Sequence, residues 1–144
     1  MISVAIDAMG GDFAPKEIVQ GAVDAAKKYD CEIVLVGDER KIRAELGGAD
    51  MDTLHISIVH AADVIGMNEA PAEAVRSKKD SSIVVATRLV KEGSCDAVLS
   101  AGSTGAAVAA ARGPAAAQVR ARGPRVSLRG PAGPPWESTA RPAR

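Results

Sequence analysis

Short apolar runs alternate with longer helical segments over residues 1–111, and this alternation limits the possible folds more than any other feature. Runs rich in Val and Ile predict strands, and apolar residues at a 3.6-residue spacing predict helices. The predicted strands lie at Ile2–Ile6, Cys31–Val36, Leu54–Val59 and Ala97–Ser100. The predicted helices run from about Pro15 to Tyr29, from Asp38 to near Leu46, over one or two turns as far as Arg76, from Ser81 to Glu92, and from Ser103 onward. The alternation predicts an α/β fold, with a parallel sheet covered by helices on both faces.

Local signals set several helix ends. Pro15 suits a first helical turn, and Asp38 and Asp80 are each expected to cap a helix. The run 83–85 (Ile-Val-Val) favours a strand locally, but the cap signals and the length of the segment favour a helix. Cys31 and Cys95 match no metal or redox spacing, so buried free thiols are expected.

The net charge of zero hides a split between two segments. Residues 1–111 carry 11 basic and 17 acidic side chains, a net charge of −6, whereas residues 112–144 carry seven Arg and one Glu, a net charge of +6. Six of the eight prolines also lie in the second segment, which shows no sustained periodicity. We therefore divide the chain into an α/β part at 1–111 and an Arg/Gly/Pro/Ala-rich tail at 112–144.

The tail has two interpretations. A basic disordered tail could bind nucleic acid, in which case binding would depend steeply on salt. Arg, Gly, Pro and Ala are also the residues that GC-rich codons specify, so an out-of-frame reading from Arg112–Gly113 onward would give the same composition. We favour the second interpretation and expect no nucleic-acid partner.

Two Gly-rich turns follow predicted strands, at Asp7–Asp12 and Ser100–Gly105. In a parallel sheet both turns lie at the carboxyl edge, where ligands bind. Backbone N–H groups at the start of a helix have no internal partner and attract anions. The turns therefore predict a phosphate or oxyanion site, although small-residue turns also serve close packing of a helix on a strand. The predicted binding residues are Gly10, Gly11, Gly102, Ser103, Thr104 and Gly105.

The sequence disfavours two other classes of protein, a dinucleotide-binding domain and a secreted or membrane-spanning protein. A dinucleotide-binding domain would require a Gly-x-Gly-x-x-Gly spacing after the first strand, and Gly10-Gly11 lacks it. The start of the chain lacks the basic region and apolar run of a signal peptide, and no apolar run approaches the length of a membrane span. A cytoplasmic protein is therefore expected.

Five motifs that occur together and in order resemble those of the bacterial phosphate acyltransferases of phospholipid synthesis. They are Asp7-Ala-Met-Gly-Gly-Asp-Phe-Ala-Pro15, Leu35-Val-Gly-Asp38, Ile58-Val-His-Ala61, Lys78-Lys-Asp-Ser-Ser82 and Ser100-Ala-Gly-Ser-Thr-Gly-Ala106. The resemblance covers about residues 1–111, the first third of the usual family length. It implies a truncated Rossmann-like α/β/α sandwich.

The resemblance also implies a reaction in which acyl-[acyl carrier protein] and inorganic phosphate give acyl phosphate and the free carrier protein. It implies no metal or organic cofactor, a homodimer, and peripheral association of a cytoplasmic enzyme with the membrane. An inactive fragment of that enzyme is the main alternative, because much of the family's cleft lies beyond Ala111. In a whole family member the strand at Ala97–Ser100 would lie inside the sheet, so its loss of a neighbour would expose an apolar edge.

Most of the remaining candidates have two alternative roles. His60 could move a proton to the leaving thiolate, or be a structural histidine. Asp7 and Asp12 could orient neighbouring donors, or form ordinary loop hydrogen bonds. Lys78 and Lys79 could attract the carrier protein or remain solvated, and Met9 and Met67 are expected to pack.

Overall fold

The computed structural model describes residues 1–112, which form a parallel four-stranded sheet with strand order β3-β2-β1-β4 and five helices. The strands are β1 (Ile2–Asp7), β2 (Cys31–Gly37), β3 (Ile56–His60) and β4 (Ala97–Ser100). The helices are α1 (Lys16–Lys28), α2 (Glu39–Leu46), α3 (Pro71–Ser77), α4 (Ser82–Lys91) and α5 (Thr104–Arg112). The predicted α/β class and parallel sheet are confirmed.

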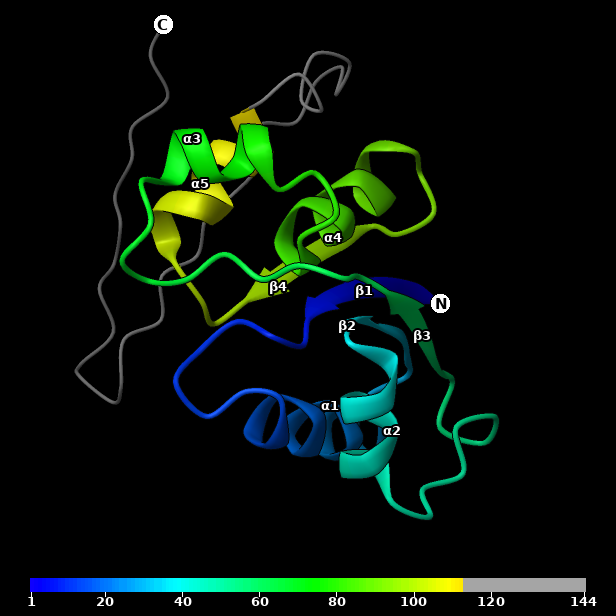
Figure 1. Cartoon of the computed structure of the whole chain (residues 1–144). Helices are drawn as coiled ribbons and strands as arrows, with labels where there is room; N and C mark the ends of the chain where they lie inside the picture. The colour runs from blue at the N-terminus through cyan, green and yellow to red at the C-terminus, as the bar shows by residue number, and fades with distance from the viewer. Residues whose placement is uncertain (113–144) are drawn as a thin grey trace, which may run out of the picture.

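Helices cover both faces of the sheet, as predicted (Figure 1). Side chains alternate between the faces of a strand, and β1 shows this plainly. Ile6 packs in one cluster with Val19 of α1, whereas Ala5 packs in another with Ala86 of α4. Helices α1 and α2 therefore lie on one face and α3, α4 and α5 on the other (Figure 1). A third cluster joins α3, α4 and α5 to one another.

The cap of α2 is as predicted and the cap of α4 is not. Asp38 Oδ1 accepts hydrogen bonds from the backbone N–H groups of Arg40 at 3.0 Å and Lys41 at 3.3 Å. The segment 83–85 is helical, as expected, but the residue at the N-cap of α4 is Ser81 and not Asp80. Asp80 instead offers its backbone carbonyl to the N–H of Asp63, which ties the start of α4 to the segment after β3.

Other expectations at element ends need small corrections. Pro15 is the N-cap of α1 and precedes its first turn. Strand β3 begins two residues later than predicted, because a turn ends at His55, where φ is +52°. The strand also ends one residue later than predicted, so His60 is its last residue and does not lie beyond it. Both cysteines are free, but Cys31 is only half-buried because it begins β2, whereas Cys95 is buried.

The chain changes faces between β1 and β4, and this sets where a ligand can bind. β1 leads into α1 on one face, while its neighbour β4 leads into α5 on the other. The carboxyl ends of two such strands leave a crevice, which is the usual ligand position in open α/β sheets. Both Gly-rich turns begin at these ends, because Asp7 and Ser100 are partners in the strand register.

Candidate functional site

A buried carboxylate joins the two strand ends at the crevice. Asp7 is 3% exposed, and its Oδ2 atom accepts a hydrogen bond of 2.7 Å from the Ser100 hydroxyl. Its Oδ1 atom accepts one of 3.2 Å from the Met9 N–H. Ser100 Oγ in turn accepts a hydrogen bond of 3.1 Å from the Gly102 N–H. One carboxylate therefore fixes the start of both Gly-rich turns.

The glycines of the two turns allow the turns to touch. A methyl group on Gly102 would lie 3.0 Å from the Gly10 Cα atom, and one on Gly10 would collide with Asp7 Oδ2. Gly11 has a φ of +117°, a backbone angle that residues with a side chain rarely adopt. A methyl group there would lie 3.3 Å from the Ala101 carbonyl oxygen. The two turns, residues 8–12 and 101–105, therefore form a single feature, which we call the corner.

The start of α5 carries capped and uncapped N–H groups. Ser103 acts as the cap, because its Oγ accepts a hydrogen bond of 3.3 Å from the Ala106 N–H and its carbonyl accepts one from Ala107. Among residues 1–112, nothing accepts a hydrogen bond from the N–H groups of Thr104 and Gly105, and both residues are exposed. These two N–H groups at a positive helix end are suited to an anion.

Two predicted binding residues have other surroundings. A methyl group on Gly105 would lie 2.6 Å from Pro71 Cγ, so the absence of a side chain at Gly105 lets α5 approach α3. Asp12 is exposed, and its carboxylate makes no hydrogen bond within the described part of the chain. The structure thus joins Asp7, Gly10, Gly11, Gly102 and the start of α5, and leaves the Asp12 side chain outside this network.

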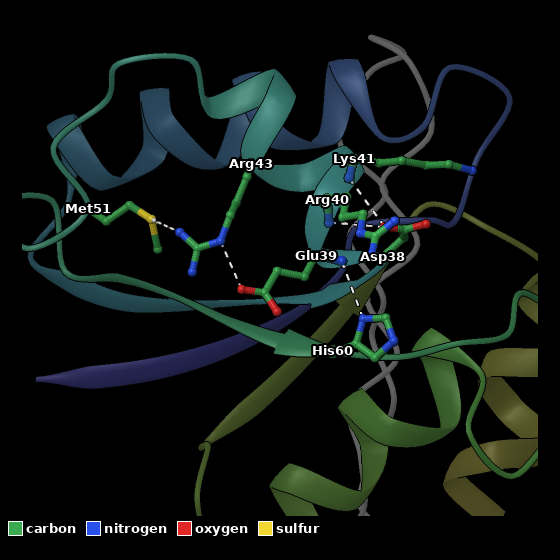
Figure 2. Close-up of polar contacts among 7 residues, drawn as sticks. All are labelled: Asp38, Glu39, Arg40, Lys41, Arg43, Met51 and His60. Carbon is green, nitrogen blue, oxygen red and sulfur yellow. Dashed lines mark hydrogen bonds and ion pairs between the residues drawn. The ribbon is translucent and has the colours of Figure 1, made fainter.

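His60 lies at the same edge of the sheet but away from the corner. β3 is two strands from β1 and three from β4, or about 10 and 14 Å at the usual strand spacing. The Nδ1 atom of His60 accepts a hydrogen bond of 3.4 Å from the Glu39 N–H at the start of α2 (Figure 2). It lines an open hollow of about 420 Å³ with Asp38, Glu39 and Arg40. The catalytic role of His60 remains a prediction.

Comparisons with known proteins assign the chain to a family. The sequence model of a family described as "Fatty acid synthesis protein" matches residues 2–120. The chain belongs to this family. It is 62% identical over 109 residues to a phosphate acyltransferase of Desulforamulus reducens and 60% identical over 110 residues to one of Pelotomaculum thermopropionicum. Each match covers 76% of this chain and 32% of the relative. The chain therefore spans about a third of the length of the curated relatives it matches.

The fatty acid synthesis family is named for lipid chemistry, and these two curated relatives are both named phosphate acyltransferase. None of the helices within residues 1–112 has the length and apolar character that a membrane crossing requires. In the same residues no three His, Cys, Asp or Glu side chains gather in a way that could hold a metal ion. The tail beyond Arg112, with its nucleic-acid and reading-frame interpretations, lies outside the described residues.

Two side chains outside the corner differ from their expected environment. Lys78 is engaged, because its Nζ atom donates to Glu69 Oε1 at 2.7 Å and to the Val64 carbonyl at 3.0 Å. Met67 was expected to pack, but its side chain is 61% exposed, because the turn that carries it projects into solvent. Met9 does pack, against Gly37.

Sequence reasoning missed Ser100 as a member of the site. The sequence places Ser100 at the start of the second Gly-rich turn and gives it no binding role, yet its hydroxyl connects Asp7 to that turn. Asp7 and Ser100 are 93 residues apart, so no local pattern pairs them. The pairing follows only from the strand order, which puts β4 beside β1.

Proposed function

We propose that the whole-length protein of this chain transfers the acyl group of acyl-[acyl carrier protein] to inorganic phosphate. The corner carries the proposal: two touching Gly-rich turns and two unpaired N–H groups of α5 lie at the switch point of a parallel sheet. The names of the curated relatives, phosphate acyltransferase, support it.

In this proposal phosphate binds at the N–H groups of Thr104 and Gly105, and the helix dipole adds partial positive charge. Gly10, Gly11 and Gly102 allow the backbone to approach the anion, and the Ser103 hydroxyl adds a donor while its oxygen caps α5. Asp7 orients the turns through Met9 and Ser100, and both Asp7 oxygens are already occupied by these donors. Asp12, at the rim, orients donors only in the bound state.

The chemistry requires little from the protein beyond alignment and charge stabilisation. A phosphate oxygen of HPO₄²⁻ forms a bond to the thioester carbonyl carbon, and the carbon–sulfur bond breaks. The proton that phosphate loses ends on the thiol of the carrier protein, so atoms and charge balance. Holding the two reactants together can supply about 7–11 kcal/mol of the barrier reduction. Donors aimed at the oxyanion supply more.

His60 remains the proposed proton donor to the thiolate, from the same edge of the sheet. The thiolate sulfur starts one bond from the carbon that phosphate attacks at the corner, so the His60 proton would cross the end of β2 through bridging water molecules, and the proton that phosphate loses would restore it. His60→Gln should lower turnover. Unchanged turnover would leave His60 with its hydrogen bond to the α2 backbone as its sole role.

A second proposal concerns this chain as it stands: an inactive fragment that retains the corner. Two observations favour it, the coverage of about a third of the relatives and the exposed edge of β4, where Val98 and Leu99 are 38% and 53% exposed.

For the whole protein we also propose a homodimer in the cytoplasm with peripheral membrane association. Light scattering would test the homodimer, and vesicle co-sedimentation would test the membrane association.

The decisive experiment measures thiol release from acyl-[acyl carrier protein] with and without phosphate. It uses this chain and the whole-length protein. Phosphate-dependent release by the whole-length protein is expected, and none by the 144-residue chain. Thiol release at the same rate with and without phosphate would contradict the proposed reaction. Turnover by the 144-residue chain would contradict the proposal that this chain is an inactive fragment.

A further inference from the structure

The start of helix α4 carries buried polar groups that have no hydrogen-bond partner among residues 1–112. Ser81, the N-cap residue, is fully buried, and its hydroxyl is unpaired. Ser82, the first residue of the helix, is 1% exposed, and its hydroxyl is unpaired too. The N–H groups of Ile83 and Val84 also find no acceptor in this part of the chain. Buried polar groups normally have partners, so four unpaired groups at one helix start indicate a ligand.

An ordinary helix cap does not account for the Ser81 hydroxyl. Ser81 has the extended backbone of an N-cap residue, with φ −72° and ψ 148°, which turns its side chain toward the first N–H groups of the helix. Asp38 has a similar backbone at the start of α2, and there the side chain does bond to Arg40 and Lys41. The Ser81 hydroxyl makes no such bond, so it and the N–H groups remain available for one common acceptor.

Helix α4 runs antiparallel to β1, and its start therefore lies at the carboxyl edge of the sheet. Near the end of the helix, the Leu89 carbonyl accepts the Cys95 N–H, and Cys95 Sγ accepts a hydrogen bond from Ser3 near the start of β1. Earlier in the helix, Ala86 packs with Ala5, two residues further along the strand. The first turn of α4 consequently reaches the end of β1, where the crevice lies.

The side of α4 that carries Ser82 faces the buried carboxylate of the corner. Ser82 and Ala86 are four residues apart and share one side of the helix. Asp7 and Ala5 are two residues apart and share one face of the sheet. Because Ala86 packs with Ala5, Ser82 lies toward Asp7. The unpaired groups of α4 are therefore directed to the crevice.

The start of α4 also adjoins the start of α5 on the same face of the sheet (Figure 1). Ile83 and Val84 pack with Ala106, which lies in the first turn of α5. The unpaired N–H groups of Thr104 and Gly105 belong to that turn. Acyl transfer to phosphate needs two sets of donors, one for the phosphate and one for the oxyanion on the carbonyl. Two helix starts at one crevice can supply both.

We infer that the start of α4 holds the oxyanion of the thioester carbonyl while phosphate is held at α5. The inference rests on the proposed function, in which the oxyanion has no assigned donors. As a phosphate oxygen bonds to the carbonyl carbon, the electron pair of the C=O bond moves to the carbonyl oxygen. The N–H groups of Ile83 and Val84 and the hydroxyls of Ser81 and Ser82 donate to that oxygen. When the pair returns, the carbon–sulfur bond breaks and the thiolate leaves.

The burial and charge of this helix start suit a carbonyl oxygen better than a phosphate. Residues 81–84 are at most 9% exposed, which leaves room for a single oxygen atom and excludes water, and exclusion of water strengthens each donor. Asp63 and Asp80 flank the helix start, where the Asp63 carbonyl accepts the Ser82 N–H. Their carboxylates repel a phosphate dianion more than a carbonyl oxygen, which is neutral until the new bond forms.

The test measures thiol release by the whole-length protein at saturating acyl-[acyl carrier protein] and varied phosphate. Ser82→Ala should lower kcat about a hundredfold, the usual loss for one oxyanion donor, and leave the KM for phosphate unchanged. The same variant should unfold at an equal or higher temperature, because Ala favours a helix and removes a buried unpaired hydroxyl. Ser81→Ala should lower kcat as well.

Thr87→Val is the matched control, because Thr87 lies on the same helix and its hydroxyl donates within it, to the Ile83 carbonyl at 2.8 Å. This variant should keep the kcat of the parent. Ser82→Ala with an unchanged kcat would overturn the inference. A raised KM for phosphate with unchanged kcat would do the same and would assign phosphate to α4. A fall in kcat accompanied by a lower unfolding temperature would indicate a structural role and contradict the inference.

The dependence on phosphate separates this inference from the proposed function. If the parent releases thiol equally with and without phosphate, and Ser82→Ala slows that release, the proposed reaction fails and the oxyanion assignment stands, since attack by water forms the same oxyanion. If phosphate drives release and Ser82→Ala matches the parent, the reaction stands and the assignment fails. A parent protein that releases no thiol would contradict both.

Discussion

The Oδ2 atom of Asp7 and the Oγ atom of Ser100 lie 2.7 Å apart, and this hydrogen bond joins strands whose residues are 93 positions apart. Asp7 is nearly inaccessible to water, so its carboxylate depends on the donors around it. The same bond fixes the orientation of Ser100, which accepts the Gly102 N–H. The geometry of the corner therefore depends on one buried interaction.

Ser100→Ala should destabilise the chain by about 1–3 kcal/mol, because the Asp7 carboxylate would lose a donor while it remains buried. Urea denaturation measures the loss. Ser94→Ala is the control, since Ser94 is exposed and its hydroxyl makes no hydrogen bond within residues 1–112. Equal stability of the two variants would show that the Asp7–Ser100 bond contributes nothing.

Gly102→Ala should cost about 1–3 kcal/mol, because the added methyl group would lie 3.0 Å from the Gly10 Cα atom and force the turns apart. Gly21→Ala should act in the opposite direction. Gly21 is exposed within α1 and has open space around it, so Ala should stabilise by about 0.5–1 kcal/mol. Thermal unfolding of both variants tests the pair, and a neutral Gly102→Ala would mean that the turns do not need to touch.

The turn that carries Met67 should respond to acid. The hydrogen bonds from Lys78 and the Gly66 N–H lower the pKa of Glu69 below its usual value of 4.5. A group with a lower pKa in the folded state stabilises the fold above its unfolded pKa and loses that contribution as the pH falls through the folded pKa. Glu69→Gln should therefore narrow the difference in stability between pH 7 and pH 3.

Glu32→Gln is the control for this pH series, because Glu32 is exposed on β2, away from any helix start, and its side chain makes no ion pair within the described residues. Its stability difference between pH 7 and pH 3 should match that of the parent chain. Glu69→Gln with an unaltered pH dependence would show that the Lys78 contact does not persist in solution.

The edge of β4 should promote self-association, because the apolar edge expected from the sequence is exposed. Val98 is 38% exposed on a strand with no outer neighbour among the described residues. A lysine on an edge strand opposes pairing with another chain. Val98→Lys should raise the monomer fraction in sedimentation measurements, and Val108→Lys, on the exposed side of α5, should not. Equal effects of the two variants would indicate a response to charge alone.

The sequence predicted those features that local patterns determine. The strand before Asp7, the helix capped by Asp38 and the α4 helix all follow from apolar spacing and cap residues, and all are present. The predicted cap residue of α4 was wrong because Asp80 and Ser81 are both suitable residue types for a cap. The contact with the segment after β3 decides between the two. The turn that carries Met67 is held by a contact between Glu69 and Lys78, nine residues apart, which no local pattern indicates.

The candidate site was predictable in its backbone and less so in its side chains. The glycines identified the turns, although one of them, Gly105, serves the packing of α5 against Pro71 of α3. The meeting of the turns required the strand order β2-β1-β4, which involves pairings across more than 90 residues. Ser100 could have been found by pairing the last polar residue of each strand that precedes a Gly-rich turn.

The most direct test of the central claim is an amide NMR titration of this chain with inorganic phosphate at constant ionic strength. The N–H resonances of Gly11, Thr104 and Gly105 should shift together with one affinity, and Ser100→Ala should weaken the effect. Sulfate and chloride controls separate phosphate recognition from general anion binding. Shifts confined to the hollow around Asp38 and His60, or no saturable shift at the corner, would contradict the account.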